Sequence, residues 1–171
     1  MIKYILFIVT LLPLSLIAQN DAAKVAHSEV VEVAGASVKT LTDRANTFMS
    51  IKRIEAKTTG NVISGIGSLL VSYPSIKFGT DQGYVKFNLK IIVKDGKYKI
   101  DLTDFRHEGM QGKSTGGSID LEKPECGEVQ ITNAAWAKIK AQTQEQLQAF
   151  VQELKKKMGN AAKVAAPNND F

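Results

Sequence analysis

The sequence predicts one α+β domain in which two helices cover one side of a curved antiparallel sheet of about four strands. Two alternating runs flank an Asp95-Gly96 turn, and apolar residues recur at helical spacing after Ser37 and after Asn133. The expected order of elements is strand, helix, strand, strand, strand, helix. A hairpin with one apolar and one polar side favours a sheet that is covered on one face only. A length of 171 residues with 44% apolar residues fits one such domain.

Residues 1–19 are typical of a secretory signal peptide. Lys3 precedes an uncharged apolar run that ends near Ala18, which is the order of regions in such signals. The run contains Pro13 and is shorter than the roughly 20 residues that a membrane span needs. We expect cleavage after Ala18 or Gln19, with an uncleaved anchor as the alternative. The mature chain is then expected to have no transmembrane segment and to reside in the periplasm or cell envelope of a bacterium, or to be secreted.

The rest of the chain divides into a linker at 20–27, the domain at 28–160 and a flexible tail at 161–171. Removing Lys3 with the signal takes the formal net charge from +5 to +4. This small excess suits an anionic surface but is too weak to indicate nucleic acid, and export makes DNA a less expected partner still.

The first half of the domain begins with a strand at 28–34, with Val31 and Val33 turned inward. Ser37 is a suitable N-cap for a helix that runs to Ile51. A turn is expected at 58–61.

A second strand is expected at 62–73, ended by Pro74 and followed by a loop at 75–83. Gly65 and Gly67 share one face of this strand, where a helix or another backbone can approach closely.

The hairpin at 84–105 is the clearest local structure. Asp95-Gly96 suits a two-residue type I′ turn, and the register then follows by counting. The apolar face pairs Val93 with Tyr98, Ile91 with Ile100 and Leu89 with Leu102. The polar face pairs Lys94 with Lys97, Ile92 with Lys99, Lys90 with Asp101 and Asn88 with Thr103.

The second half of the domain is expected to be loop at 109–127, with a short extended piece near 118–121. A helix starts at Asn133 and ends at Gly159-Asn160. Its apolar stripe thins after Ile139, where Thr143 and Gln146 have the spacing of a capping box, so the helix is expected to break and restart there.

Several of these segments resemble a known family. The segments are Glu29-Val-Val-Glu-Val-Ala-Gly35, Gly65-Ile-Gly67-Ser68 and Tyr98-Lys-Ile-Asp-Leu-Thr-Asp-Phe-Arg-His107. They are similar to an exported bacterial domain of unknown function with a TATA-binding-protein-like fold, over about residues 28–107. The resemblance implies a curved antiparallel sheet with helices on one side. It implies no catalytic residue, and fold similarity to a DNA-binding protein is not evidence for DNA binding.

The polar face of the hairpin is a candidate binding surface. It carries Lys86, Lys90, Lys94, Lys97 and Lys99 against Asp101, and we also place the apolar Ile92 and Phe105 there. A basic sheet face can receive anionic lipid headgroups, glycan or an acidic protein, although exposed lysines also protect strands from aggregation. The predicted binding residues are Lys86, Lys90, Ile92, Lys99, Asp101, Arg106 and His107.

Catalysis is the alternative hypothesis. Asp104, Arg106, His107 and Glu108 form the densest polar cluster, and histidine beside acids can transfer protons near neutral pH. Charged strand ends are also common for solubility alone. Cys126 is the only cysteine and makes no internal disulfide; acids at Glu125 and Glu128 raise the pKa of its thiol rather than activate it.

Metal and cofactor motifs are not found in the sequence. Neither the two histidines nor the cysteine occurs at a metal-ligand spacing, and Gly65-Ile-Gly67 lacks the third glycine of a dinucleotide motif because Leu70 stands there. We therefore expect no cofactor and no metal. The first hypothesis is a non-enzymatic envelope domain that binds an envelope protein or an anionic glycan or lipid headgroup through its sheet face. The second is a small envelope hydrolase that uses His107 with Asp104 or Cys126.

Overall fold

The computed structural model describes residues 26–75, 77, 79–110 and 113–159. The predicted signal peptide, most of the linker and the predicted tail lie outside these residues. The elements in chain order are β1 (His27–Glu32), α1 (Val38–Ile51), β2 (Lys57–Thr59), β3 (Val62–Ser75), β4 (Gly79–Lys94), β5 (Lys97–Gly109), β6 (Gly117–Ser118) and α2 (Asn133–Gly159).

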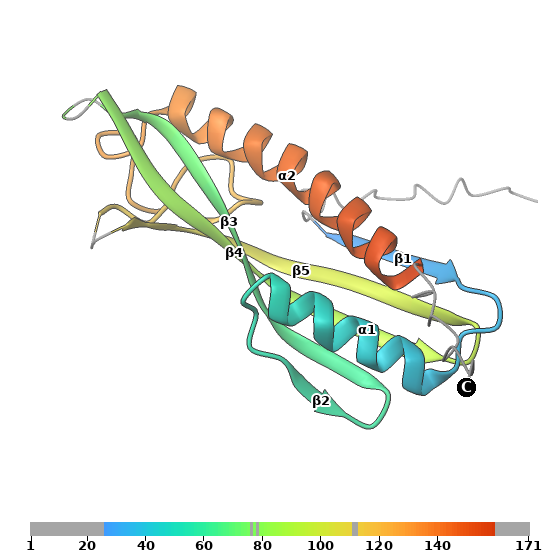
Figure 1. The fold of residues 1–171 in the computed structure, drawn as a ribbon. Coiled ribbons are helices and arrows are strands. Elements are labelled where there is room, and N and C mark those ends of the chain that lie inside the picture. Colours follow the sequence, from blue (N-terminus) through green and yellow to red (C-terminus); the bar gives the residue numbers. More distant parts are fainter. Residues whose placement is uncertain (1–25, 76, 78, 111–112, 160–171) are drawn as a thin grey trace, which may run out of the picture.

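One antiparallel sheet with strand order β1-β5-β4-β3-β2 forms the centre of the fold, and β6 pairs with β5 beyond the end of β1. Figure 1 shows α1 and α2 on the same side of this sheet. The α+β class and the two helices on one face are therefore confirmed. The sheet has six strands rather than about four, because β2 and β6 are short strands that carry little alternating pattern in the sequence.

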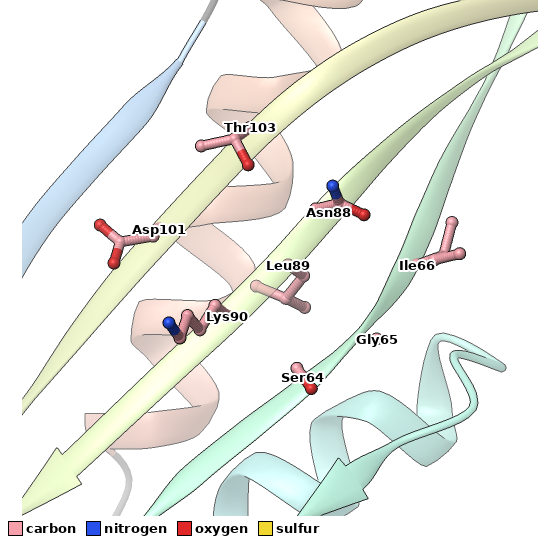
Figure 2. Close-up of a pocket in the computed structure, with 8 residues that line it drawn as sticks. All are labelled: Ser64, Gly65, Ile66, Asn88, Leu89, Lys90, Asp101 and Thr103. Carbon is pink, nitrogen blue, oxygen red and sulfur yellow. The ribbon is translucent and has the colours of Figure 1, made fainter.

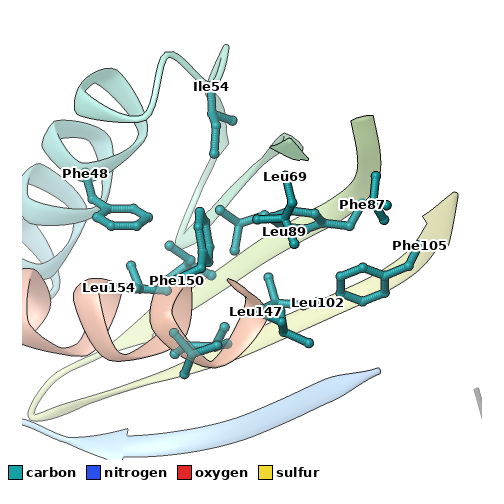
Figure 3. Packing of buried hydrophobic residues seen from close by; sticks show 14 of the residues in the cluster. Phe48, Ile54, Leu69, Phe87, Leu89, Leu102, Phe105, Leu147, Phe150 and Leu154 are labelled. Atoms are coloured by element: carbon teal, nitrogen blue, oxygen red, sulfur yellow. The ribbon is translucent and has the colours of Figure 1, made fainter. Parts of the chain in front are cut away.

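The hydrophobic core lies between the sheet and the two helices (Figure 3). Alternate residues of β3, β4 and β5 supply the sheet side of the core, and α1 contributes the buried Leu41, Ala45, Phe48 and Met49. Phe150 of α2 meets Phe48 of α1 and Phe87 of β4 in edge-to-face contacts, with ring centroids 5.3 Å apart in both pairs. These contacts hold both helices against the same part of the sheet.

The predicted register of the β4–β5 hairpin is confirmed at every pair from Asn88–Thr103 to Lys94–Lys97. The type I′ turn is wrong, because Arg53 and Asp104 alone among the described non-glycine residues have positive φ. Asp95 instead accepts a hydrogen bond from the backbone N–H of Val38 at 2.9 Å. The turn thus satisfies an N–H at the start of α1 and ties the hairpin to that helix.

The ladder between β4 and β5 is irregular at one place. Lys86 pairs with Arg106 and Asn88 with Thr103, so that Asp104 and Phe105 together face Phe87 in a β-bulge. Asp104, with a φ of 58°, is the extra residue and reverses the alternation beyond it. Phe105 is 1% exposed and stacks on Phe87 in the core, so its placement on the polar face was wrong.

The predicted loop at 75–83 is also wrong, since β3 continues through Pro74 to Ser75 and β4 begins at Gly79. Proline interrupts a strand only where its missing N–H was needed by the ladder. The N–H of Ser72 points away from β4 and donates to the side chain of Gln142. Pro74 lies two residues farther along β3, so its backbone nitrogen points in the same direction. Pro74 therefore loses no hydrogen bond to β4.

The close approach expected at Gly65 and Gly67 is confirmed. A Cβ on Gly65 would lie 2.6 Å from a side-chain carbon of Ile54 and 2.7 Å from the carbonyl oxygen of Glu55, both just after α1. A Cβ on Gly67 would lie 2.3 Å from the ring of Phe87. The missing side chains let the segment after α1 and the Phe87 ring sit directly on β3.

α2 is continuous over 27 residues, so the predicted break near Thr143 is wrong. Thr143 is fully buried, and its hydroxyl donates to the carbonyl of Ile139 within the helix at 2.8 Å. The apolar stripe thins because α2 passes the edge of β3 here. Gln142 and Gln146 hydrogen-bond to the backbone of Ser72 and Leu70.

We expect Gly67→Ala to destabilise the fold, because the new methyl group must displace the buried Phe87 ring. Overpacking of this kind costs about 1–3 kcal/mol. Urea unfolding of the purified variant measures the loss. The matched control is Gly35→Ala, where no atom lies within 4 Å of the new Cβ but φ is +75°. The packing argument would be contradicted if Gly67→Ala lost no more unfolding free energy than Gly35→Ala, which reports the backbone strain alone.

Deleting Asp104 tests the bulge. One-for-one pairing would then set Phe105 opposite Phe87 and Arg106 opposite Lys86, so Phe105 and His107 would still face the helix side. We therefore expect a loss well below the about 3 kcal/mol that removing a buried phenylalanine costs. Asp104→Gly is the control, since it keeps the extra residue and suits positive φ. Thermal unfolding measures the loss, and a deletion as destabilising as the removal of a buried phenylalanine would show that Asp104 is not simply the extra residue of the ladder.

Candidate functional site

The face of the sheet turned away from α1 and α2 is called the open face here. Charged and polar side chains of β4 and β5 lie on it, as the hairpin register predicts. The structure places six of the seven predicted binding residues on this face: Lys86, Lys90, Ile92, Lys99, Asp101 and Arg106.

A shallow hollow of about 500 Å³ lies in the middle of the open face. Figure 2 views it with the helices behind the sheet. Small polar side chains of three adjacent strands form its floor, namely Ser64, Asn88 and Thr103. Lys90 and Asp101 border it, and Ile66 stands on the β3 side. The hollow exists because these central positions carry short side chains.

The charges around the hollow are unequally compensated. The ammonium of Lys99 lies 2.9 Å from a carboxylate oxygen of Asp101, and the hydroxyl of Ser28 donates to the same oxygen at 2.7 Å. Lys99 first, then Ser28 and the charge of Lys90, hold the pKa of Asp101 below its usual value although burial opposes them. No described carboxylate lies within 4.0 Å of the Lys90 ammonium. Lys90 is therefore the cation of the hollow that is available to a ligand.

The other two predicted cations are engaged by carboxylates. Lys86 lies 2.5 Å from Glu108 and Arg106 lies 3.2 Å from Glu125. Both pairs are about half exposed, so they contribute little to stability but do neutralise this end of the face. The predicted basic surface is thus less basic at the Lys86–Arg106 end, whereas Lys90 and the exposed Lys94 and Lys97 have no described carboxylate within 4.0 Å.

Exposed apolar side chains lie beside the hollow, and the sequence analysis missed them. Ile66 is 65% exposed, Leu70 46% and Tyr84 38%, and Leu70 and Tyr84 are direct partners across β3 and β4. The signal was present in the sequence, because apolar residues occupy both faces of the strand at 62–73. An apolar patch beside a polar hollow is typical of an interaction surface.

His107 does not belong to the open face. The bulge at Asp104 turns it to the helix side, where it is 0% exposed between the rings of Tyr73 and Trp136. Its Nδ1 accepts from the backbone N–H of Gly116 at 3.0 Å, so the neutral ring carries its proton on Nε2. Burial lowers the pKa of His107 to about 4, against a smaller opposing effect of Glu108.

The residues of the hydrolase hypothesis are not assembled as catalysis requires. Asp104 is exposed on the bulge while His107 is buried on the opposite face. Burial raises the pKa of the Cys126 thiol, which keeps it protonated and unreactive near neutral pH. A general base works best with a pKa near the operating pH, which His107 lacks.

Within the part of the chain that the structure describes, no three histidine, cysteine or acidic side chains are grouped as metal ligands. No helix there is long and apolar enough to cross a membrane.

A second cavity of about 590 Å³ lies at the end of β3 and β4 farthest from the Asp95–Gly96 turn, beside Tyr73. Lys113 binds the Asp81 carboxylate there and, with Ser75, lowers the pKa of Asp81.

An open antiparallel sheet with two helices on one face defines the structural class of this protein. Residues 27–108, which run from the start of β1 to the penultimate residue of β5, match the family described as a domain of unknown function (DUF4468) with a TBP-like fold. This segment is therefore similar to the DUF4468 family, and the fold of the chain is TBP-like.

Two solved structures are similar over most of the chain. One is a DUF4468 family protein from Bacteroides ovatus, with 14% identity and a TM-score of 0.54 over 84% of this chain and 90% of that one. The other is a TBP-like protein from Parabacteroides distasonis, with 14% identity and a TM-score of 0.53 over 82% of this chain and 96% of that one. At this identity the likeness shows the fold alone. No curated protein matches the chain.

The buried His107 predicts a pH dependence of stability. As the pH falls, the His107 imidazole takes up a proton near pH 6.5 in the unfolded chain and near pH 4 in the folded chain. Stability from this group is therefore complete above pH 6.5 and is lost as the pH falls toward 4, by roughly 3 kcal/mol in all. Urea unfolding of the parent and of His107→Phe between pH 4 and 7 measures it. The difference between the two curves should shrink as the pH falls, and a constant difference would contradict the prediction.

Proposed function

We propose that this protein is an exported, non-enzymatic binding module whose open face takes an anionic group of a partner in the bacterial cell envelope. The observation that carries the proposal is the hollow in the open face, where Lys90, with no described carboxylate within 4.0 Å of its ammonium, stands among hydrogen-bonding side chains. Residues 1–19, with Lys3 before an apolar run, support export.

The chemistry of the hollow supports an oxyanion. Lys90 offers an ammonium, Asn88 an amide N–H, and Ser64 and Thr103 hydroxyls that can donate. Asp101 is the one acid on the rim, and its charge is offset by Lys99. A carboxylate or phosphate beside Lys90 would gain a charge-assisted hydrogen bond without displacing an existing ion pair.

The exposed apolar residues support a partner larger than a free ion. Ile66 borders the hollow, and Leu70 and Tyr84 continue from it along β3 and β4. A protein segment, an anionic glycan or a lipid headgroup with its adjoining chain can cover such a surface while its anion reaches Lys90. Nucleic acid is disfavoured, because carboxylates neutralise three of the six cations of this face, Lys86, Lys99 and Arg106, and only Lys90, Lys94 and Lys97 remain to contact phosphates.

Reversing one charge tests this function. We expect Lys90→Glu to weaken binding by at least about tenfold, since a repulsive carboxylate replaces a charge-assisted contact. Binding is measured separately to vesicles with and without phosphatidylglycerol, to an acidic polysaccharide and to solubilised envelope proteins, which distinguishes the three sources of the anion.

The matched control is Lys138→Glu, which makes the same charge change at an exposed position of α2 on the other side of the molecule. If both variants bind every probe as the parent does, or lose binding equally, the open face is not the binding surface.

A further inference from the structure

The outer edge of β3 is covered at both ends and open between them. In an antiparallel strand, alternate residues direct both backbone groups to the same side. Val62 and Ser64 pair outward with Thr59 and Lys57 of β2. Farther along, the outward N–H of Ser72 donates to the side-chain oxygen of Gln142 at 2.9 Å. The side-chain amide nitrogen of Gln142 donates to the carbonyl of Ser72 at 2.8 Å.

The same parity places the backbone groups of Ile66, Ser68 and Leu70 on the outer edge, because β3 pairs with β4 without interruption. The carbonyl of Leu70 accepts from Gln146 at 2.7 Å. No described residue hydrogen-bonds to the outward N–H or C=O of Ile66 or Ser68. Both residues are exposed. Two donors and two acceptors are thus presented to solvent at the spacing of an extended chain.

A cavity opens beside this gap on the helix side of the sheet. It has a volume of about 190 Å³ and lies between the end of α1, the edge of β3 and the middle of α2. Ile54, Leu69, Ala149 and Phe150 supply apolar walls, and the rim carries the ion pair of Lys52 with Glu153 at 2.5 Å. The gap in the edge therefore has an adjoining place for an apolar side chain.

We propose that an extended peptide segment of a partner protein binds at this edge of β3 as an added strand. Its backbone completes the ladder at Ile66 and Ser68, which gives affinity without regard to sequence. Its residue opposite Gly67 points to the helix side and places an apolar side chain in the cavity. The flanking residues of the peptide point to the open face beside Ile66 and Leu70, where apolar side chains also gain contact.

The length of the gap favours a short segment over a second copy of this chain. Pairing β3 with β3 of another copy about Gly67 would set Leu70 and Ser72 of the copy against Ser64 and Val62. Lys57 and Thr59 of β2 already occupy that position. Between β2 and Gln146 there is room for about five residues of a strand, at about 3.3 Å per residue. Only a short extended segment whose flanking residues leave the edge of β3 enters it.

The experiment is a selection of phage-displayed random heptapeptides on the purified protein, followed by affinity and amide hydrogen-exchange measurements on the selected peptides. Ser68→Pro removes the outward N–H without removing a bond to β4, and its ring obstructs an added strand. Ser68→Ala is the control that keeps the N–H. Ala149→Phe fills the cavity from an exposed helix position and serves as a second variant.

We expect peptides whose binding slows exchange of the Ile66 and Ser68 amides by at least about tenfold. Ser68→Pro and Ala149→Phe should each weaken binding by at least about tenfold, while Ser68→Ala retains it. Lys90→Glu should also retain it, which separates this site from the open face. Failure to select any peptide, or peptides that leave these two amides unprotected, would overturn the proposal.

Sedimentation of the free protein adds a final arm. A concentration-dependent dimer in the parent chain that Ser68→Pro abolishes would identify a second copy as the occupant, and it would overturn the assignment to a partner peptide.

Discussion

The ladder between β4 and β5 is interrupted once, where Asp104 and Phe105 face Phe87 alone. The extra residue is accommodated because aspartate tolerates the left-handed conformation better than most residues. Beyond it, Phe105 and His107 enter the core while Arg106 and Glu108 turn outward. The backbone of Phe105 then receives the N–H of Ile119, and His107 receives the N–H of Gly116. The bulge thus attaches the segment around β6 to the sheet and sets which side chains it packs against.

The same irregularity divides the open face into two electrostatic regions. Beyond the bulge, Lys86 and Arg106 are opposite one another, and each is neutralised by a separate acid. On the turn side of the bulge, Lys99 forms the ion pair with Asp101, while Lys90, opposite Asp101 on β4, has no described carboxylate within 4.0 Å. Short side chains at Ser64, Asn88 and Thr103 leave space beside that cation. The charge of the face therefore depends on ion pairs within β5, between β4 and β5, and from β5 to a loop, rather than on the number of its lysines.

The sequence predicted those parts of the fold that follow from local pattern. The Asp95-Gly96 reversal determined the hairpin register even though the turn type was wrong, because any two-residue connection gives the same pairs. Ser37 caps α1 as its side chain indicates, accepting from the N–H of Thr40. The two consecutive polar residues Thr103 and Asp104, between Leu102 and Phe105, were the available signal for the bulge.

The errors concern contacts between segments far apart in the chain. Pro74 could remain in β3 because its nitrogen faces the outer edge, which depends on the register between β3 and β4. Thr143 could remain in α2 because its hydroxyl bonds within the helix while the neighbouring glutamine caps β3. For the same reason the sequence indicated a basic face but not its ion pairs. Glu125, which neutralises Arg106, belongs to a loop whose path no periodic pattern defines.

Ile66 connects the two surfaces proposed for binding, since its side chain borders the hollow while its backbone faces the open edge of β3. A strand added at that edge would extend the open face by one strand. Its outward side chains would stand next to Ile66 and Leu70, which are now exposed. The apolar flank of the hollow would then become part of a wider surface, so an edge-bound peptide would alter what the open face can bind. The coupling needs no movement of the core, because Gly67 and Phe87 already fix β3 against the helices.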